Sequence, residues 1–131
     1  MNPEGSVEAR VRRIVAEALD RPEDQVRLSS SLVDDLGAES IDFLDLVFRL
    51  ETAFGIKIPE EDLWAGSADL ARADAATFER GIARLRTEMP DFAWERFPNG
   101  VTRADLPRLI TVRTIVDYLE RTGPAAGPAA P

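Results

Sequence analysis

Apolar residues recur at helical spacing, every three or four positions, in several stretches of the chain. The first of these stripes consists of Val7, Val11, Ile14, Val15, Ala18 and Leu19. Ser6 is suited to cap its start, and Pro22 disfavours helical geometry at the residue before it. This pattern predicts a helix over residues 7–19, followed by a long and mostly polar connection over 20–39.

A second stripe begins at Ser40 and runs to Phe54, with Gly55 suited to end the helix. Because apolar residues occupy more than one side of this segment, we expect the helix to be covered on two sides. Pro59 then suits the first turn of a short helix that ends near residues 64–66.

The following segment predicts another amphipathic helix over residues 67–89, which Pro90 ends. Its apolar face consists of Phe78, Ile82, Leu85 and Met89. Residues 91–100 are rich in aromatic side chains and irregular, and Thr102 is suited to cap a short helical turn at 103–106.

Thr111 is suited to cap a last helix, whose apolar face holds Val112, Ile115, Val116 and Leu119. No stretch shows strand-like alternation, so we predict an all-α fold: a bundle of three long helices and a short one, with a helical insert over about 66–100. Residues 1–122 are expected to form a single domain, and the Gly/Pro/Ala-rich residues 123–131 a disordered tail.

The composition excludes several classes of function. The 131 residues contain no Cys and no His, so the chain lacks thiolates, the commonest metal ligand and the usual general base. We therefore expect no catalytic residue and no metal site. The net charge of -8 argues against a nucleic-acid binder, which needs a basic face. With no bilayer-length apolar stretch and no signal pattern, we expect a cytoplasmic protein without stable membrane insertion.

The negative charge is concentrated in one part of the chain. Residues 28–64 hold nine acidic and two basic side chains. This segment either faces a partner with a basic surface or is simply a solvated, solubilising face.

The segment around Ser40 is the most informative chemically, because there the loop becomes a helix. The unpaired N–H groups of a first helical turn would favour an anionic group attached to the Ser40 hydroxyl. Gly37 permits an unusual backbone angle or close approach by a partner. Ser is also a favoured N-cap residue, so the segment is open to a purely structural interpretation. No general base lies nearby, which excludes a hydrolase nucleophile.

The segment Asp34-Asp35-Leu36-Gly37-Ala38-Glu39-Ser40-Ile41-Asp42-Phe43 resembles the Asp-Ser-Leu motif of acyl carrier proteins, with Glu39 and Ile41 at the flanking positions. Residues 11–19, 34–54, 58–64 and 111–119 are similar to the four helices of that family. The resemblance implies an acyl-carrier-like bundle without enzymatic activity. It also implies that a phosphopantetheinyl transferase attaches 4′-phosphopantetheine from coenzyme A to Ser40.

Two further sets of residues acquire roles from this resemblance. The first set would contact basic patches on acyl-chain synthesis enzymes and acyltransferases: Asp35, Glu39, Asp42, Asp45 and Glu51. The second set would either belong to the core or line a groove for the acyl chain: Phe43, Leu44, Val47, Phe48, Phe54, Ile58 and Trp64. Weak, fast contacts suit a carrier, expected to be a monomer, that visits many enzymes.

Within the family, residues 41–48, 54–59 and Trp64, together with 101–119, resemble the specialised carriers of very-long-chain acyl groups for lipid A in alphaproteobacteria. This resemblance implies a role in fatty-acid or lipid biosynthesis. The insert over 66–100 is additional to what these carriers possess. A carrier for a polyketide or other secondary metabolite, and an unmodified carrier-like interaction module, therefore stay open. We expect the insert to lie beside the acyl groove as a pocket wall or lid. Its alternatives are an extension of the core or a self-association patch.

Overall fold

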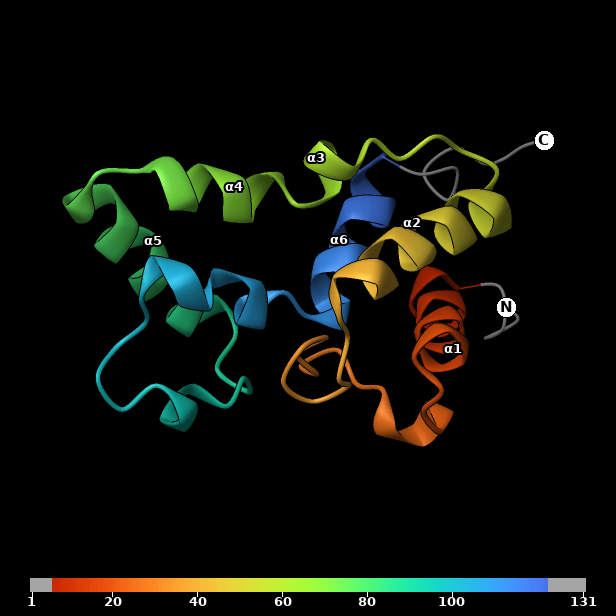
Figure 1. Cartoon of the computed structure of the whole chain (residues 1–131), viewed down its shortest axis with the longest axis horizontal. Helices are drawn as coiled ribbons and strands as arrows, with labels where there is room; N and C mark the ends of the chain where they lie inside the picture. Colours follow the sequence, from red (N-terminus) through yellow and green to blue (C-terminus); the bar gives the residue numbers. More distant parts are fainter. Residues whose placement is uncertain (1–5, 123–131) are drawn as a thin grey trace.

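The computed structural model describes residues 6–122, without the side chains at positions 60, 61 and 65. The regular elements of this part of the chain are helices (Figure 1), and loops connect them; one isolated antiparallel bridge joins Ser31 and Thr111. The elements are α1 (Val7–Leu19), η2 (Glu23–Gln25), α2 (Ser40–Phe54), α3 (Glu60–Leu63), α4 (Ala65–Arg72), α5 (Ala75–Glu88), η3 (Trp94–Arg96), η4 (Arg103–Leu109) and α6 (Val112–Thr122). The predicted all-α fold is confirmed. The tail predicted at 123–131 lies outside the described residues.

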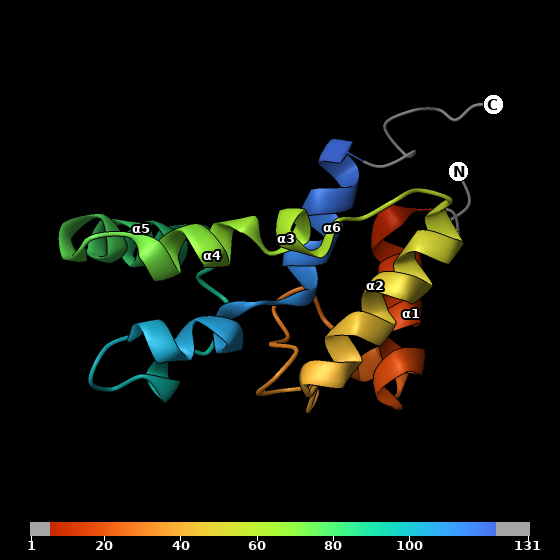
Figure 2. The same ribbon diagram turned by 45° about the horizontal axis from the view of Figure 1, so that its top comes forward.

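Helices α1, α2, α3 and α6 enclose a first hydrophobic core, in which α1 packs against both α2 and α6 (Figure 2). Each long helix turns its apolar stripe inward, so that Val11, Leu50 and Ile115 are fully buried. The predicted three long helices and one short helix correspond to these four elements.

The long connection between α1 and α2 is packed rather than free. The buried Ser31 hydroxyl donates to the carbonyl of Arg108 at 2.7 Å, and the Leu32 N–H donates to the carbonyl of Ile110 at 3.0 Å. These bonds hold the loop against the segment that leads into α6. They also explain how a connection this long is accommodated in a small domain.

In the structure the insert extends beyond the predicted residues 66–100 as far as η4, and it has a hydrophobic core of its own. α4, α5, η3 and η4 surround a second cluster that shares no residue with the first: Phe78, Ile82, Phe92, Phe97, Leu106 and Leu109 are its buried members. The Trp94 ring packs edge-on against Phe92 at 4.8 Å between centroids, and its Nε1–H donates to the carbonyl of Met89 at 2.8 Å. The insert is therefore more than an enlargement of the first core.

The prediction of one helix over 67–89 is wrong, because the chain breaks between α4 and α5. Asp74 is the N-cap of α5, and its side chain accepts from the Thr77 N–H at 2.8 Å. Gly81 then lets the two helices approach closely, since an added Cβ would lie 2.5 Å from the Leu70 Cδ2 atom. The helical turn predicted at 103–106 is the longer η4, which tolerates Pro107 in 3-10 geometry.

Acid is expected to weaken the insert through its two capping aspartates. Hydrogen bonds from the Thr77 and Thr102 backbone N–H groups hold the pKa values of Asp74 and Asp105 below the ordinary value of 3.8. A lowered pKa means that the stabilisation is present above pH 3.8 and is lost as the pH falls through the folded-state value.

The measurement is the melting temperature of the insert, followed by NMR, for the parent protein and for Asp74→Asn. Asn keeps the capping acceptor but does not titrate. The parent should be the more stable of the two at neutral pH, and the difference should vanish well below pH 3.8. A difference that is independent of pH would contradict the assignment.

Candidate functional site

Ser40 is the first residue of α2, and its side chain is exposed. Glu39, not Ser40, is the N-cap, and the Glu39 N–H donates to Asp42 Oδ2 at 2.8 Å in a capping box. The interpretation of Ser40 as the N-cap is therefore wrong, because Asp42 already secures the helix start. Within the described part of the chain, no protein group hydrogen-bonds to the Ser40 hydroxyl.

The loop before Ser40 holds it in a fixed position on the surface. Leu36 and Ala38 are buried in the first core, and the Ala38 N–H donates to the carbonyl of Leu32 at 2.8 Å. Gly37 lies between them at φ 74°, where a Cβ would come within 3.1 Å of the Arg21 guanidinium. The anchored loop thus presents the hydroxyl at the positive end of a 15-residue helix, a position that favours an anionic substituent.

Two arginines of the insert reach the acidic pair in this loop. Arg108 Nε lies 3.0 Å from each carboxylate oxygen of Asp34, and Arg96 hydrogen-bonds to Asp35. The bond to Asp35 is the main cause that raises the pKa of Arg96. We call Asp34, Asp35, Arg96 and Arg108 the Asp–Arg clasp; it ties the insert to the loop that carries Ser40.

The predicted partner-binding carboxylates mostly have partners within the chain. Besides Asp35 in the clasp and Asp42 in the capping box, Asp45 pairs with Arg49 at 2.8 Å, and Glu51 accepts from the Ile58 N–H at 2.7 Å. Glu39 is exposed. The Asp45–Arg49 pair is itself more than 40% exposed on both sides, so it is available to compete for a charged partner.

Helix α2 is covered on one side only, so the expectation of two covered sides is wrong. Ile41 is 70% exposed, Leu44 59% and Phe48 66%. They lie at helical spacing on the side of α2 away from the first core, and among the described residues that side of the helix is largely open to solvent. We call these three residues the α2 apolar patch; an unpartnered patch of large apolar side chains marks an interaction surface.

The seven residues predicted as core or acyl groove divide into three groups. Val47, Phe54 and Ile58 are buried in the first core, whereas Leu44 and Phe48 belong to the α2 apolar patch. Phe43 and Trp64 are half-buried, and their rings meet edge to face at 5.4 Å.

A hollow of about 320 Å³ opens beside Ser40, and we call it the Ser40 hollow. It is lined by Ser40, Phe43, Trp64, Pro107 and Ile110. Of the seven groove candidates, the structure thus brings only Phe43 and Trp64 to the serine. Sequence reasoning missed Pro107 and Ile110, since nothing in their local pattern distinguishes them from ordinary loop residues.

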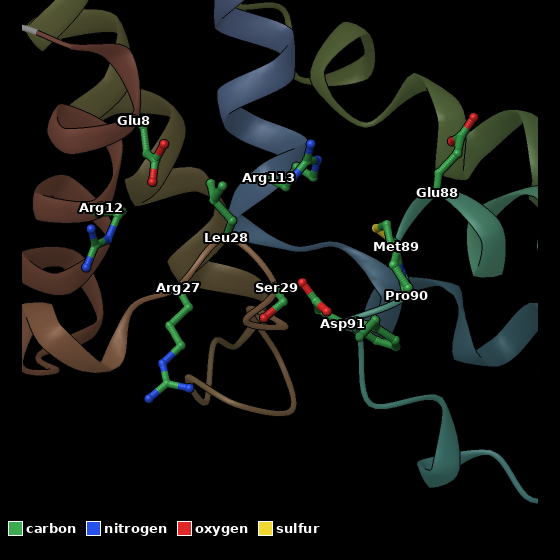
Figure 3. A pocket seen from close by; sticks show the side chains of 11 residues that line it. Glu8, Arg12, Arg27, Leu28, Ser29, Glu88, Met89, Pro90, Asp91 and Arg113 are labelled. Carbon is green, nitrogen blue, oxygen red and sulfur yellow. The ribbon is translucent and has the colours of Figure 1, made fainter.

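Another pocket, of about 410 Å³, lies at the meeting of α1, the loop after it, α6 and the end of α5 (Figure 3). It mixes arginines such as Arg12, Arg27 and Arg113 with carboxylates such as Glu8 and Asp91, and Ser40 is not among its lining residues. In residues 6–122 no group of three carboxylates could hold a metal ion, and no helix is long and apolar enough to cross a bilayer.

The comparison with family models identifies the region of Ser40. Residues 9–72 match the family described as phosphopantetheine attachment site. The match runs from α1 to α4, contains Ser40 and its anchored loop, and ends before α5. Domains of this family are carriers rather than catalysts, and they bear 4′-phosphopantetheine covalently. Residues 9–72 are thus similar to phosphopantetheine attachment domains, and this similarity supports an acyl or peptidyl carrier role.

Proposed function

We propose that this protein is an acyl carrier whose Ser40 bears the 4′-phosphopantetheine arm. In the attachment step the Ser40 Oγ forms a bond to the phosphorus of coenzyme A that bears the pantetheine, 3′,5′-ADP leaves, and the hydroxyl proton passes to a base of the transferase. The arm's thiol then holds acyl groups as thioesters. The chain itself supplies an exposed hydroxyl at the positive end of α2.

The exposure of Ser40 is the observation that carries this proposal. The matched segment contains five serines, and Ser40 alone among them is exposed. Ser30 and Ser31 are buried, and Ser29 and Ser67 are half-buried. A transferase that must bring a phosphate to a hydroxyl therefore finds one accessible serine.

Intact mass spectrometry tests the proposal directly. The protein is incubated with coenzyme A and a broad-specificity phosphopantetheinyl transferase, and the modified peptide is mapped. One pantetheine phosphate on the Ser40 peptide supports the carrier. No gain in mass would favour the unmodified interaction module instead.

We assign the carrier to fatty-acid or lipid biosynthesis, with lipid A acylation as the specific pathway. Support comes from the resemblance of residues 41–48, 54–59, Trp64 and 101–119 to the lipid A carriers. In this proposal residues 1–122, with the insert at 66–100, act as one cytoplasmic, monomeric domain. Mass analysis of the acyl groups on holo-protein from its own cells decides between long straight chains and polyketide intermediates.

The α2 apolar patch and the carboxylates beside it are the docking surface in this proposal. Phe48→Ser should slow phosphopantetheine transfer several-fold but change stability by less than about 0.5 kcal/mol, because the ring is exposed. Asp45→Lys should also slow transfer, mainly at low salt, because the attraction between exposed charges is screened over about 8 Å at physiological salt.

Glu17→Lys is the matched control, since Glu17 is exposed on α1 and the change in net charge is the same. The measurement is the transfer rate against salt concentration for each variant. If Asp45→Lys and Glu17→Lys behave alike, the effect is one of total charge and the docking surface is wrongly placed.

A further inference from the structure

An apolar cavity of about 210 Å³ lies where the insert meets the bundle, and we call it the junction cavity. Its walls come from α3, α4, α5, η4 and the start of α6, and six of the lining side chains are aliphatic: Leu63, Leu70, Leu85, Leu106, Leu109 and Ile110. None of the described side chains that line it is charged. Such a space suits an apolar ligand and offers little to a polar one.

The junction cavity adjoins the Ser40 hollow. Trp64 and Ile110 line both spaces. The centre of the first core is closely packed, since side chains such as Leu46 and Leu50 are fully buried there. The junction cavity is therefore an apolar space beside the hollow in which an arm on Ser40 would begin.

We propose that the junction cavity holds the acyl chain, so that the tail lies between the two hydrophobic cores and outside the bundle core. This inference rests on the proposed function, because the arm on Ser40 delivers the chain. A water molecule takes up about 30 Å³ of liquid and a methylene group is of similar size, so the cavity has room for about seven such groups. Its occupant is a medium-length acyl chain.

The far side of the cavity sets the length that is protected. Leu63, Leu85 and Thr114 also border a more open space of about 550 Å³. That space is rimmed by charged side chains, among them Arg113 and Asp117. A tail much longer than eight carbons would pass the aliphatic walls and reach this charged, solvent-exposed rim. Further methylene groups would gain little protection there.

The experiment loads the full chain with acetyl-, octanoyl- or hexadecanoyl-phosphopantetheine from the corresponding acyl-coenzyme A. The rate of thioester cleavage by hydroxylamine is measured and divided by that of the same acyl-pantetheine free in solution. We expect the octanoyl thioester to be protected several-fold relative to the acetyl thioester, and the hexadecanoyl thioester to gain little more.

Ser67→Phe places a ring at the wall of the junction cavity and should remove the octanoyl protection. The matched control is Ala71→Phe on the same helix, at an exposed position outside the cavity lining, and it should keep the protection. Leu85→Ala enlarges the cavity and should extend protection to longer chains. It serves as the second test if the Ser67 variant does not fold.

The two proposals fail in different ways. If no acyl-phosphopantetheine is transferred to Ser40, the carrier function itself is wrong. If transfer proceeds but acetyl and octanoyl thioesters are cleaved at equal relative rates, the junction cavity does not hold the chain. Equal protection in the parent and in Ser67→Phe would overturn the inference as well.

Discussion

Replacing Ser40 by alanine is expected to abolish the gain of a phosphopantetheine group while leaving the fold unchanged. The hydroxyl is the acceptor in the proposed transfer, so the loss should be complete rather than partial. Loss of a true N-cap would cost about 0.5–2 kcal/mol. Because Glu39 and Asp42 form the capping box, the Ser40→Ala protein should instead melt within a degree or two of the parent.

Intact mass after incubation with coenzyme A and transferase, together with a thermal melt, gives both readouts. Ser29→Ala is the control, since Ser29 lies in the same matched segment but is half-buried, and this variant should still accept one group. Modification of the Ser40→Ala protein would show that another serine bears the arm.

Truncating Phe78 to alanine is expected to unfold the insert while the bundle stays folded. Removing a buried Phe side chain from a core costs about 3–5 kcal/mol. Phe78 belongs to the second core, which shares no residue with the first. The NMR signals of α5 should therefore lose dispersion, whereas those of α1 and α2 remain and Ser40 still accepts phosphopantetheine.

Leu50→Ala is the counterpart in the first core and should cost about 2–5 kcal/mol there. It should lower the melting temperature of α1 and α2 and, above that temperature, prevent the loading of Ser40. If both variants lower a single melting temperature that all helices share, the two cores unfold as one cooperative unit. The prediction that they unfold independently would then be wrong.

The helices of the bundle could be predicted from the sequence because their signals are local. α1 spans Val7–Leu19 and α2 spans Ser40–Phe54, where the apolar stripes and the flanking Pro22 and Gly55 place them. The break between α4 and α5 is not predicted from the apolar pattern, because the pattern of residues 67–89 shows no interruption at Asp74. The capping preference of that single aspartate outweighed the continuity of the pattern.

The surroundings of Ser40 were predictable only in part. The motif predicts a serine where a loop becomes a helix, and in the structure Ser40 is the exposed first residue of α2. Pro107 and Ile110 in the Ser40 hollow, and Arg96 and Arg108 in the Asp–Arg clasp, come from the far end of the insert. No local sequence pattern predicts these neighbours, because their positions depend on how the insert packs against the bundle.

That packing has a consequence for the order in which the protein folds. α6 belongs to the first core, yet the whole insert separates it from α3 in the chain. The entropy lost in closing a flexible loop rises with the logarithm of its length. Once α4, α5 and η4 have assembled, Trp64 and Ile110 stand on the walls of a single cavity, and α6 begins beside α3. α6 then needs only a nearly local conformational search to dock onto the bundle. The stability of the insert therefore governs the rate at which the bundle folds.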